Sequence, residues 1–369
     1  MVATRPIRIA FVCPYYLPHL GGVEAHVSKL AVAAIHAGYE AEVITQAHDA
    51  ALPAVQVLDG VTVRRFASVV PNHNYALAPG VWTYLRRNAA RFDIVHAHSY
   101  HALPALAAAL AAPRVLIFTP HYHGTGHSPF RRLLHIPYRP FGATVVRRAI
   151  RVICVSEAEA ALVRRHFPGS ASRLLVIPNG IEVDAIRAAE PYDLEPKIIL
   201  SVGRLESYKQ VDLVIEAMAH LEPEVLLKVI GDGPERVALE RRVDNQKLRG
   251  RVEFLGWVSD QSLYRWYRTA AVYVTCSRHE AFGMTAWEAL SGGAAVVASR
   301  IPAYREIARR QDRQLVQLAP VTASARTLAE AIDALIDARG SVPAREALTW
   351  DVVAARTLNV YREVARGAV

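Results

Sequence analysis

The chain has 369 residues, of which 52% are hydrophobic, 21% charged and 8% aromatic. This length suffices for two ordinary domains, and the composition excludes an intrinsically disordered or fibrous protein. The formal charge of +9 leaves nucleic acid, an anionic membrane and small anionic ligands as candidate partners. The excess is uneven, because residues 1–190 hold 19 Lys and Arg against 11 Asp and Glu, and the remainder holds 24 against 23. Thirteen of the 15 histidines also lie before residue 190.

The first half alternates short β-branched runs with helical patterns. The predicted strands are 7–13, 41–45, 61–66, 94–97, 115–119, 152–155 and 174–177. Apolar residues recur every three or four positions at 25–36 and 104–112, which predicts helices. The apolar run at 9–13 is too short for a signal-peptide core, and the stretch 102–113 is shorter than the roughly 20 residues of a membrane span. We therefore expect no membrane-crossing segment.

The second half repeats the same alternation. Its predicted strands are 198–202, 226–230, 252–255, 272–275, 295–298 and 315–318, and its predicted helices are 211–220, 235–245, 263–268, 286–290 and 324–337. Strands that alternate with helices favour parallel sheets covered on both faces. The sequence thus predicts an α/β protein of two Rossmann-like, doubly wound domains, at 1–185 and 190–350. The linker is expected near 183–196, where Pro191 and Pro196 interrupt the pattern.

The cysteines indicate the compartment. Cys13, Cys154 and Cys276 lie far apart, in or at the end of apolar runs, and form no C-x-x-C pair. This pattern predicts buried free thiols in a reducing cytoplasm.

Ligands of open α/β sheets bind at the carboxyl ends of strands, so candidate residues are expected in the loops that follow strands. Gly21 and Gly22 precede the first helix and would let backbone amides approach an anion, although an ordinary turn has the same appearance. No G-x-G-x-x-G fingerprint occurs, which argues against a dehydrogenase.

Two cations follow the first predicted strand of the second half. Arg204 and Lys209 could hold a diphosphate, the arginine through paired hydrogen bonds and the lysine as a point charge. Solvated surface cations are the alternative interpretation.

The segment 278–288 carries the strongest pattern. Glu280 is expected in a loop, Gly283 and Met284 at the start of a helix, and Glu288 about one turn inside it. Backbone amides at such a helix start bind anions, and two carboxylates suit the hydroxyl groups of a sugar and a ribose. A capping acid and a solvated helix glutamate are the alternative.

Here the sequence resembles a known family. Glu280-x7-Glu288, with Phe282-Gly283 inside it, is similar to the acidic motif of glycosyltransferase family 4, the retaining nucleotide-sugar transferases of the GT-B fold. Further matches span nearly the whole chain: Gly21-Gly22-Val23-Glu24, Ile177-Pro178-Asn179-Gly180, Gly203-Arg204 with Lys209, Gly231-Asp232-Gly233-Pro234-Glu235, and Thr349-Trp350-Asp351 through Tyr361. The resemblance implies two domains facing across a cleft, with a C-terminal helix, about 351–369, that crosses back to the first domain.

The resemblance also implies roles for individual residues. Arg204 and Lys209 would grip the donor diphosphate, Glu280 the transferred sugar, and Glu288 the ribose. Further donor contacts would come from Gly21, Gly22, Gly231, Leu255, Phe282, Gly283 and Met284. His121 is the best match to the family's active-site histidine, with His123 and His127 as alternatives. His121, Glu280, Arg204 and Lys209 are therefore the predicted catalytic residues.

Two pairs of histidines have a spacing that metal sites also show. His96 and His98, like His121 and His123, are two positions apart and could place two ligands on one face of a strand. Polar, substrate-binding or structural roles are the preferred interpretation, and the resemblance implies neither a metal nor another cofactor.

A basic segment accounts for much of the charge excess. Apolar residues alternate there with five arginines: Arg131, Arg132, Arg139, Arg147 and Arg148. A solvated face is one interpretation, and a surface for an anionic membrane or a phosphate-bearing acceptor is the other. Nucleic acid is not expected, because no nucleic-acid-binding signature occurs.

The resemblance thus implies a retaining hexosyltransferase that uses a GDP- or UDP-linked sugar and a hydroxyl acceptor, with lipid-linked or cell-envelope precursors as candidates. A nucleotide-sugar epimerase or hydrolase of the same architecture is the alternative. A cytoplasmic enzyme, peripheral at the inner face of a membrane, is the expected location.

Overall fold

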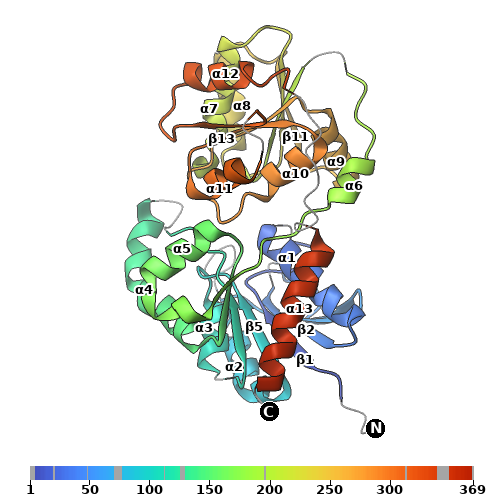
Figure 1. Ribbon diagram of the computed structural model, residues 1–369, viewed down its shortest axis with the longest axis vertical. Helices are drawn as coiled ribbons and strands as arrows, with labels where there is room; N and C mark the ends of the chain where they lie inside the picture. The colour runs from blue at the N-terminus through green and yellow to red at the C-terminus, as the bar shows by residue number, and fades with distance from the viewer. Residues whose placement is uncertain are drawn as a thin grey trace. The chain divides into compact units, whose positions relative to one another are not determined.

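The structure is a computed structural model that describes residues 5–19, 21–47, 49–69, 77–111, 113–124, 129–194, 197–311, 314–338 and 349–367, with the backbone alone for 129–138. The chain forms two compact units (Figure 1). Unit 1 comprises Met1–Gly180 with Trp350–Val369, and unit 2 comprises Ile181–Thr349.

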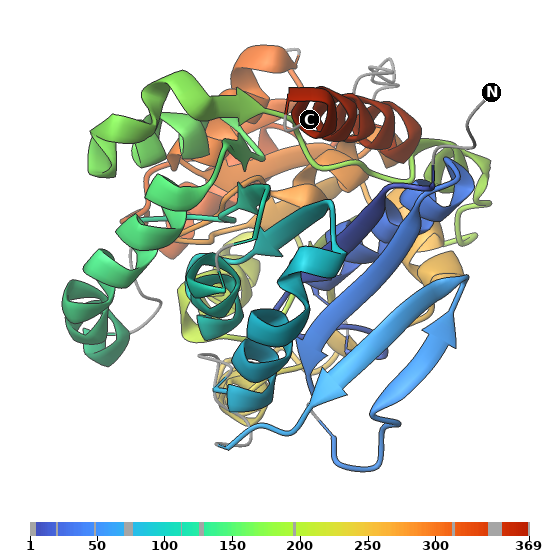
Figure 2. The same ribbon diagram turned by 90° about the horizontal axis from the view of Figure 1, so that it is seen from below.

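In its described residues, unit 1 is built on an eight-stranded sheet of order β3-β4-β2-β1-β5-β6-β7-β8. The strands are β1 Arg8–Val12, β2 Glu40–Gln46, β3 Val55–Leu58, β4 Val61–Phe66, β5 Ile94–His98, β6 Leu116–Thr119, β7 Arg151–Cys154 and β8 Leu174–Val176. All neighbours pair in parallel except β3, which is antiparallel to β4 at the sheet edge (light blue in Figure 2). The chain order reverses at β1 and β5, which is where such sheets bind ligands.

Helices cover both faces of this sheet. They are α1 Gly22–His36, α2 Pro79–Asn88, α3 Leu103–Leu110, α4 Pro129–Arg148, α5 Glu157–His166 and α13 Trp350–Gly367. One face packs residues such as Val12 and Val95 against α2 to α5. The other packs residues such as Phe11 and Ile94 against α1 and α13, which lie together in Figure 1. Strands buried on both faces need continuous apolar runs, and the sequence supplies them.

Unit 2 contains, in its described residues, a six-stranded parallel sheet of order β11-β10-β9-β12-β13-β14. Its strands are β9 Ile198–Val202, β10 Leu226–Ile230, β11 Val252–Gly256, β12 Val272–Thr275, β13 Ala295–Ser299 and β14 Val316–Ala319. Its helices are α6 Val183–Ala188, α7 Val211–Ala217, α8 Arg236–Asn245, α9 Asp260–Thr269, α10 Met284–Gly292, α11 Pro302–Arg310 and α12 Ala325–Asp333. Helices α7, α8 and α12 pack on one face, and the order reverses at β9 and β12.

These observations confirm the predicted fold class, with two Rossmann-like sheets and a C-terminal helix. The predicted linker at 183–196 is wrong in its first part, because Val183–Ala188 forms helix α6 of unit 2. Strand β3 and helices α2, α4, α5 and α11 were not predicted. Strand β3 could not be predicted because a short, exposed edge strand lacks the continuous apolar run of a buried strand.

The structure bears on two predictions, one about the cysteines and one about membrane-crossing segments. Cys13, Cys154 and Cys276 are buried free thiols, as the sequence predicted. In the described residues, no helix combines the length and the apolar character that crossing a membrane requires.

Candidate functional site

The two loops at the reversal point of unit 2 lie together. One follows β9 and carries Arg204 and Lys209, and the other follows β12 and carries Glu280. The backbone N–H of Arg278 in the second loop donates to the Tyr208 carbonyl in the first, at 2.9 Å. Because β9 and β12 are adjacent strands, their carboxyl ends bring together segments about 70 residues apart in the chain, as in other α/β ligand sites.

An ion pair links the loops. Lys209 Nζ lies 2.6 Å from Glu280 Oε1, and the side chains are only 17% and 19% exposed. Burial disfavours the charged lysine, but the attraction of the Glu280 carboxylate outweighs it and raises the pKa of Lys209 well above its ordinary value. Lys209 is therefore a fixed cation, and its ammonium has three donors, of which Glu280 uses one.

Tyr304 supports the carboxylate from helix α11. Its hydroxyl lies 3.5 Å from Glu280 Oε1 and 3.0 Å from Thr275 Oγ1 at the end of β12. Burial raises the pKa of Tyr304 well above its ordinary value, so this hydroxyl keeps its proton. Glu280 is thus held by two groups that the sequence places far from one another.

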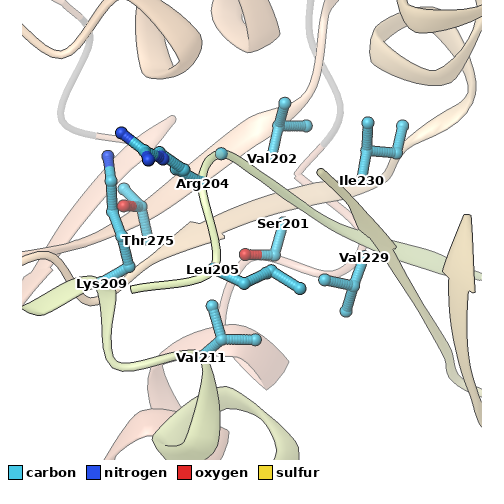
Figure 3. Close-up of a pocket in the computed structure, with 10 residues that line it drawn as sticks. Ser201, Val202, Arg204, Leu205, Lys209, Val211, Val229, Ile230 and Thr275 are labelled. Atoms are coloured by element: carbon cyan, nitrogen blue, oxygen red, sulfur yellow. The ribbon is translucent and has the colours of Figure 1, made fainter. Parts of the chain in front are cut away.

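A small hollow opens beside this ion pair. It is lined by residues of β9, β10 and the loop after β9, together with Thr275 (Figure 3). Arg204 and Lys209 both line it, and Figure 3 shows their nitrogen-bearing ends on the same side of it. Arg204 is about half exposed and lies 3.4 Å from Glu206. The cations are therefore not scattered over the surface, and two of the predicted catalytic residues share one hollow.

Glycine is required at the end of β10. Gly231 has φ +123°, and a Cβ atom there would collide with the carbonyl oxygen of Gly203. The Gly231 N–H donates to the Gly256 carbonyl at 2.8 Å, so Leu255, the residue before Gly256 in β11, also lies at this edge of the sheet. The structure thereby places Gly231 beside the first loop and Leu255 in the outer strand at the same edge of the sheet.

Helix α10 starts at the predicted position. Gly283 is its N-cap with φ +82°, and a Cβ atom there would lie 2.7 Å from Tyr304 Cε1. Phe282 is buried and stacks on Trp287 at 6.1 Å between ring centroids, while Met284 is the first helical residue. The positive end of the helix dipole thus lies just after the loop of Glu280, where it favours an anion.

Glu288 is held inside unit 2. Its Oε2 accepts a hydrogen bond of 2.8 Å from the Tyr267 hydroxyl. Burial raises the pKa of Glu288 to about 7, although the Tyr267 bond opposes the shift. Glu288 is therefore a partly buried, hydrogen-bonded side chain, and its contact with ribose remains a prediction.

Gly21 and Gly22 stand at the start of α1 in unit 1, at the reversal point of that sheet. Gly21 is the N-cap, and its backbone is extended. A Cβ atom at Gly21 would collide with the Glu24 carboxylate, which is buried in the first turn and lies 3.4 Å from His19 Nδ1. A carboxylate thus already occupies the space beside Gly21.

The structure separates the candidate histidines. His121, which follows β6 and has φ +48°, lies 5.1 Å from His26 and 5.8 Å from His98 between ring centroids. His123 instead stacks on His101 at 4.7 Å. His127 lies outside the described residues. His121 is therefore the candidate at the reversal point of unit 1.

A buried acid that the sequence did not reveal holds this loop. The Glu159 carboxylate accepts hydrogen bonds from the backbone N–H groups of Tyr122 and of Val155, the latter at 2.6 Å. Burial raises the pKa of Glu159 to about 8, against the effect of these bonds. Glu159 therefore fixes the backbone directly after His121.

The basic segment forms helix α4. The side chains of Arg131 and Arg132 lie outside the described part, and Arg139, Arg147 and Arg148 are exposed. The Arg148 guanidinium donates to the Ala109 carbonyl at the end of α3, at 2.6 Å, and so has a structural contact. Arg139 and Arg147 remain candidates for an anionic surface.

Sequence reasoning missed Tyr304, Thr275, His26 and Glu159. Each acts through a neighbour that is distant in the chain, and a single sequence gives no signal for such pairs. Only His26 could have been found from the sequence, because it lies in the helix that begins at the Gly21-Gly22 loop.

Comparisons with known sequences cover both units. Residues 20–185 match the protein family Glycosyltransferase Family 4, and residues 182–349 match Glycosyl transferases group 1. The phosphatidyl-myo-inositol mannosyltransferase of Mycolicibacterium smegmatis is 30% identical over 98% of this chain and 95% of its own length. The D-inositol 3-phosphate glycosyltransferase of Xylanimonas cellulosilytica is 26% identical over 99% of both chains.

Solved structures agree on the fold. Sucrose-phosphate synthase from Thermosynechococcus elongatus has a TM-score of 0.82 at 21% identity and covers 98% of this chain and 100% of its own. Anabaena HepE in complex with UDP-glucose has a TM-score of 0.75 at 18% identity and covers 97% and 100%. With the full-length relatives, these matches show that the chain belongs to glycosyltransferase family 4 and is a retaining hexosyltransferase of the GT-B fold.

Proposed function

We propose that this enzyme transfers a hexose from a GDP- or UDP-linked donor to a hydroxyl group of an inositol-phosphate acceptor carried on a lipid. The observation that carries the proposal is the meeting of Arg204, Lys209 and Glu280 at the reversal point of the unit 2 sheet. Two cations and a carboxylate suit a sugar diphosphate, because the cations match the phosphates and the carboxylate accepts from sugar hydroxyls.

The donor binds with its diphosphate on the cations. Lys209 keeps its bond to Glu280 and directs a second N–H to a phosphate oxygen, since an ammonium has three donors. Arg204 reaches from the exposed side of the hollow, and the start of α10 adds its dipole. Negative charge grows on the departing diphosphate in the transition state, so these groups stabilise that state more than the bound donor.

The transferred sugar lies against Glu280. The carboxylate orients its hydroxyl groups, and Tyr304 fixes the carboxylate in turn. For a retaining reaction we propose attack by the acceptor hydroxyl on the face that the diphosphate leaves, with the acceptor proton passing to the leaving phosphate oxygen. His121 is proposed to contact the acceptor side.

The acceptor class is supported by the relatives. One is a phosphatidyl-myo-inositol mannosyltransferase and the other a D-inositol 3-phosphate glycosyltransferase, and both match along their full length. An acceptor of this class is anionic, which suits the excess of 19 Lys and Arg over 11 Asp and Glu in residues 1–190. We further propose that exposed Arg139 and Arg147 on α4 hold the enzyme at an anionic membrane surface on the cytoplasmic side.

The test is a transfer assay with a crossed panel. Purified protein is incubated with GDP-mannose, UDP-glucose or UDP-N-acetylglucosamine, each with phosphatidylinositol in mixed micelles, with free inositol phosphate, or without acceptor. Mass spectrometry is expected to detect a lipid-linked hexoside with one donor base only. Product NMR is expected to show the anomeric configuration of the donor.

The controls separate the alternatives. Phosphatidylglycerol replaces phosphatidylinositol as a lipid of equal charge that lacks the inositol ring. Complete donor hydrolysis or epimerisation without any acceptor would favour the alternative enzyme class. Transfer to free inositol phosphate with none to the lipid would contradict the lipid acceptor, and binding of no nucleoside diphosphate in a thermal-shift assay would contradict the donor site.

A further inference from the structure

Two histidines on the same strand have different surroundings. His96 and His98 lie on one face of β5, and both are fully buried. His96 has partners for both ring nitrogens, with the Tyr361 hydroxyl 2.6 Å from Nδ1 and the Thr119 hydroxyl 2.8 Å from Nε2. Neither ring nitrogen of His98 has a hydrogen-bond partner among the described residues.

His98 lies in a group of three histidines. It is joined by His26 from α1 and His121 from the loop after β6, and one ring nitrogen of each lies within 4.8 Å of those of the other two. The rings of His26 and His98 are 5.5 Å apart between centroids. The three therefore converge from three different elements at the point where the order of the unit 1 sheet reverses.

Several ring nitrogens of these three histidines lack hydrogen-bond partners among the described residues. His26 is 2% exposed, and neither of its ring nitrogens has a hydrogen bond of normal geometry to a described residue. His121 Nε2 is also buried without one. A buried polar group without a partner is costly, so three such imidazoles at one point indicate a ligand that all three can share.

We propose that His26, His98 and His121 form a binding site for one divalent transition-metal ion of the zinc class. Imidazole nitrogens suit Zn²⁺, Co²⁺, Ni²⁺ and Cu²⁺, whereas Ca²⁺ and Mg²⁺ prefer oxygen ligands. In a tetrahedral site with bonds of about 2.0 Å, the nitrogens lie roughly 3.4 Å apart. The observed spacing therefore needs only small rotations of the rings.

The protonation state fits a metal ligand, which must be a neutral imidazole. Burial lowers the pKa of His26 to about 4 and the pKa values of His98 and His121 well below their ordinary value. Asn179 lies near His26 and opposes its shift. Three histidines leave a fourth position for an oxygen ligand such as water or a hydroxyl group.

This proposal goes beyond the proposed function and shares only His121 with it, the residue that the proposed function places on the acceptor side. The family resemblance implies no metal requirement for transfer, and the site concerns binding whether or not turnover needs it. Metal stoichiometry can therefore fail while transfer succeeds, and the reverse holds too.

The first experiment uses the unmodified chain without a polyhistidine tag, because such a tag binds the same metals. Protein stripped with EDTA is titrated with ZnCl₂ against a chromophoric chelator, and with CoCl₂ in the visible range. We expect one equivalent of each per chain and the intense visible bands of four-coordinate cobalt. X-ray absorption of the zinc form is expected to show three imidazole ligands. Absence of one tight equivalent would overturn the proposal.

The second experiment locates the ion. His26→Gln, His98→Gln and His121→Gln are each expected to weaken zinc binding by about 100-fold or more, since even loss of a group behind a ligand costs about 10–100-fold. Exposed His36 and His220 provide matched His→Gln controls that are expected to keep full affinity. Retained binding in His98→Gln, with loss in His101→Gln or His123→Gln, would place the ion elsewhere and overturn the assignment.

Discussion

Lys209 and Glu280 form an ion pair at 2.6 Å between Nζ and Oε1, although 71 residues separate them in the chain. The pair connects the two loops that meet where the unit 2 sheet reverses its order. It sets the local charge at the proposed donor site: one fixed lysine cation, partly balanced by Glu280, with Arg204 beside it in the same hollow.

Substitution of Lys209 is the first prediction. Lys209→Gln is expected to lower kcat by about 10²–10³, because removal of one group that stabilises developing charge has an effect of that size. The measurement is the rate of transfer at saturating donor. Lys197→Gln, which breaks the exposed pair with Asp337, is the matched control and is expected to keep normal turnover. Normal turnover in both variants would show that Lys209 does not belong to the catalytic site.

The same pair makes a prediction about stability without donor. Glu280→Gln and Lys209→Gln are each expected to lower the free energy of unfolding, since each leaves a partly buried group unpaired. The double variant is expected to lose less than the sum, with a coupling of about 0.5–3 kcal/mol in a denaturant double-mutant cycle. Additive losses would show that the ion pair does not stabilise the loops.

Gly283→Ala tests the start of helix α10. The left-handed backbone at φ +82° disfavours a side chain, and the new methyl group would press on Tyr304 at 2.7 Å. We expect a loss of about 1–3 kcal/mol in unfolding free energy and a larger loss in transfer, because Tyr304 also contacts Glu280. Gly250→Ala is the control, since no atom lies within 4 Å of its Cβ position. Equal effects of the two substitutions would contradict this account.

Glu288 predicts a pH dependence. Its pKa of about 7 lies above the ordinary 4.5, so the folded state holds a proton that the unfolded state releases between these values. The stability of unit 2 is therefore expected to fall as pH rises from about 4.5 to about 7, by at most about 3 kcal/mol. Glu288→Gln cannot titrate and is expected to remove this slope. Parallel unfolding curves of wild type and variant against pH would contradict the prediction.

Membrane binding tests the surface of α4. The double variant Arg139→Gln/Arg147→Gln is expected to bind phosphatidylglycerol vesicles about tenfold or more weakly, since each surface cation contributes about 1 kcal/mol. Binding of the wild type is expected to decrease with added salt. Arg241→Gln/Arg326→Gln, on exposed positions of unit 2, is the matched control for net charge. Sedimentation with vesicles measures both, and equal losses would indicate a general charge effect.

The sequence predicted buried strands better than any other element. The bounds of β9, β10 and β12 agree with their predicted ranges, because a strand covered on both faces is mostly apolar, and Lys228 interrupts the run of β10 only once. Strand β3 has no such constraint, and two of its valines, Val55 and Val57, are exposed.

Some residues of the candidate site could also be predicted from the sequence, and others could not. The loops that carry Arg204, Lys209 and Glu280 follow predictable strands, so their meeting could be expected from the rule for parallel sheets. The partners that hold them could not, since Tyr304 and Glu159 are recognised only by contacts across the fold. The histidine group shows both outcomes. The sequence indicates His98 as a possible metal ligand through its spacing from His96, whereas His26 has no such neighbour.

Helix α13 bears on how the chain folds during synthesis. The Tyr361 hydroxyl reaches His96 across 265 residues of sequence, and Val353, Leu358 and Val364 complete the apolar face that α1 shares. The ribosome delivers all of unit 2 before these residues emerge, so the unit that comes second in the sequence can be the first to finish folding. Until then, the part of the unit 1 sheet that α13 covers remains open to water, and a chaperone would find its binding surface there.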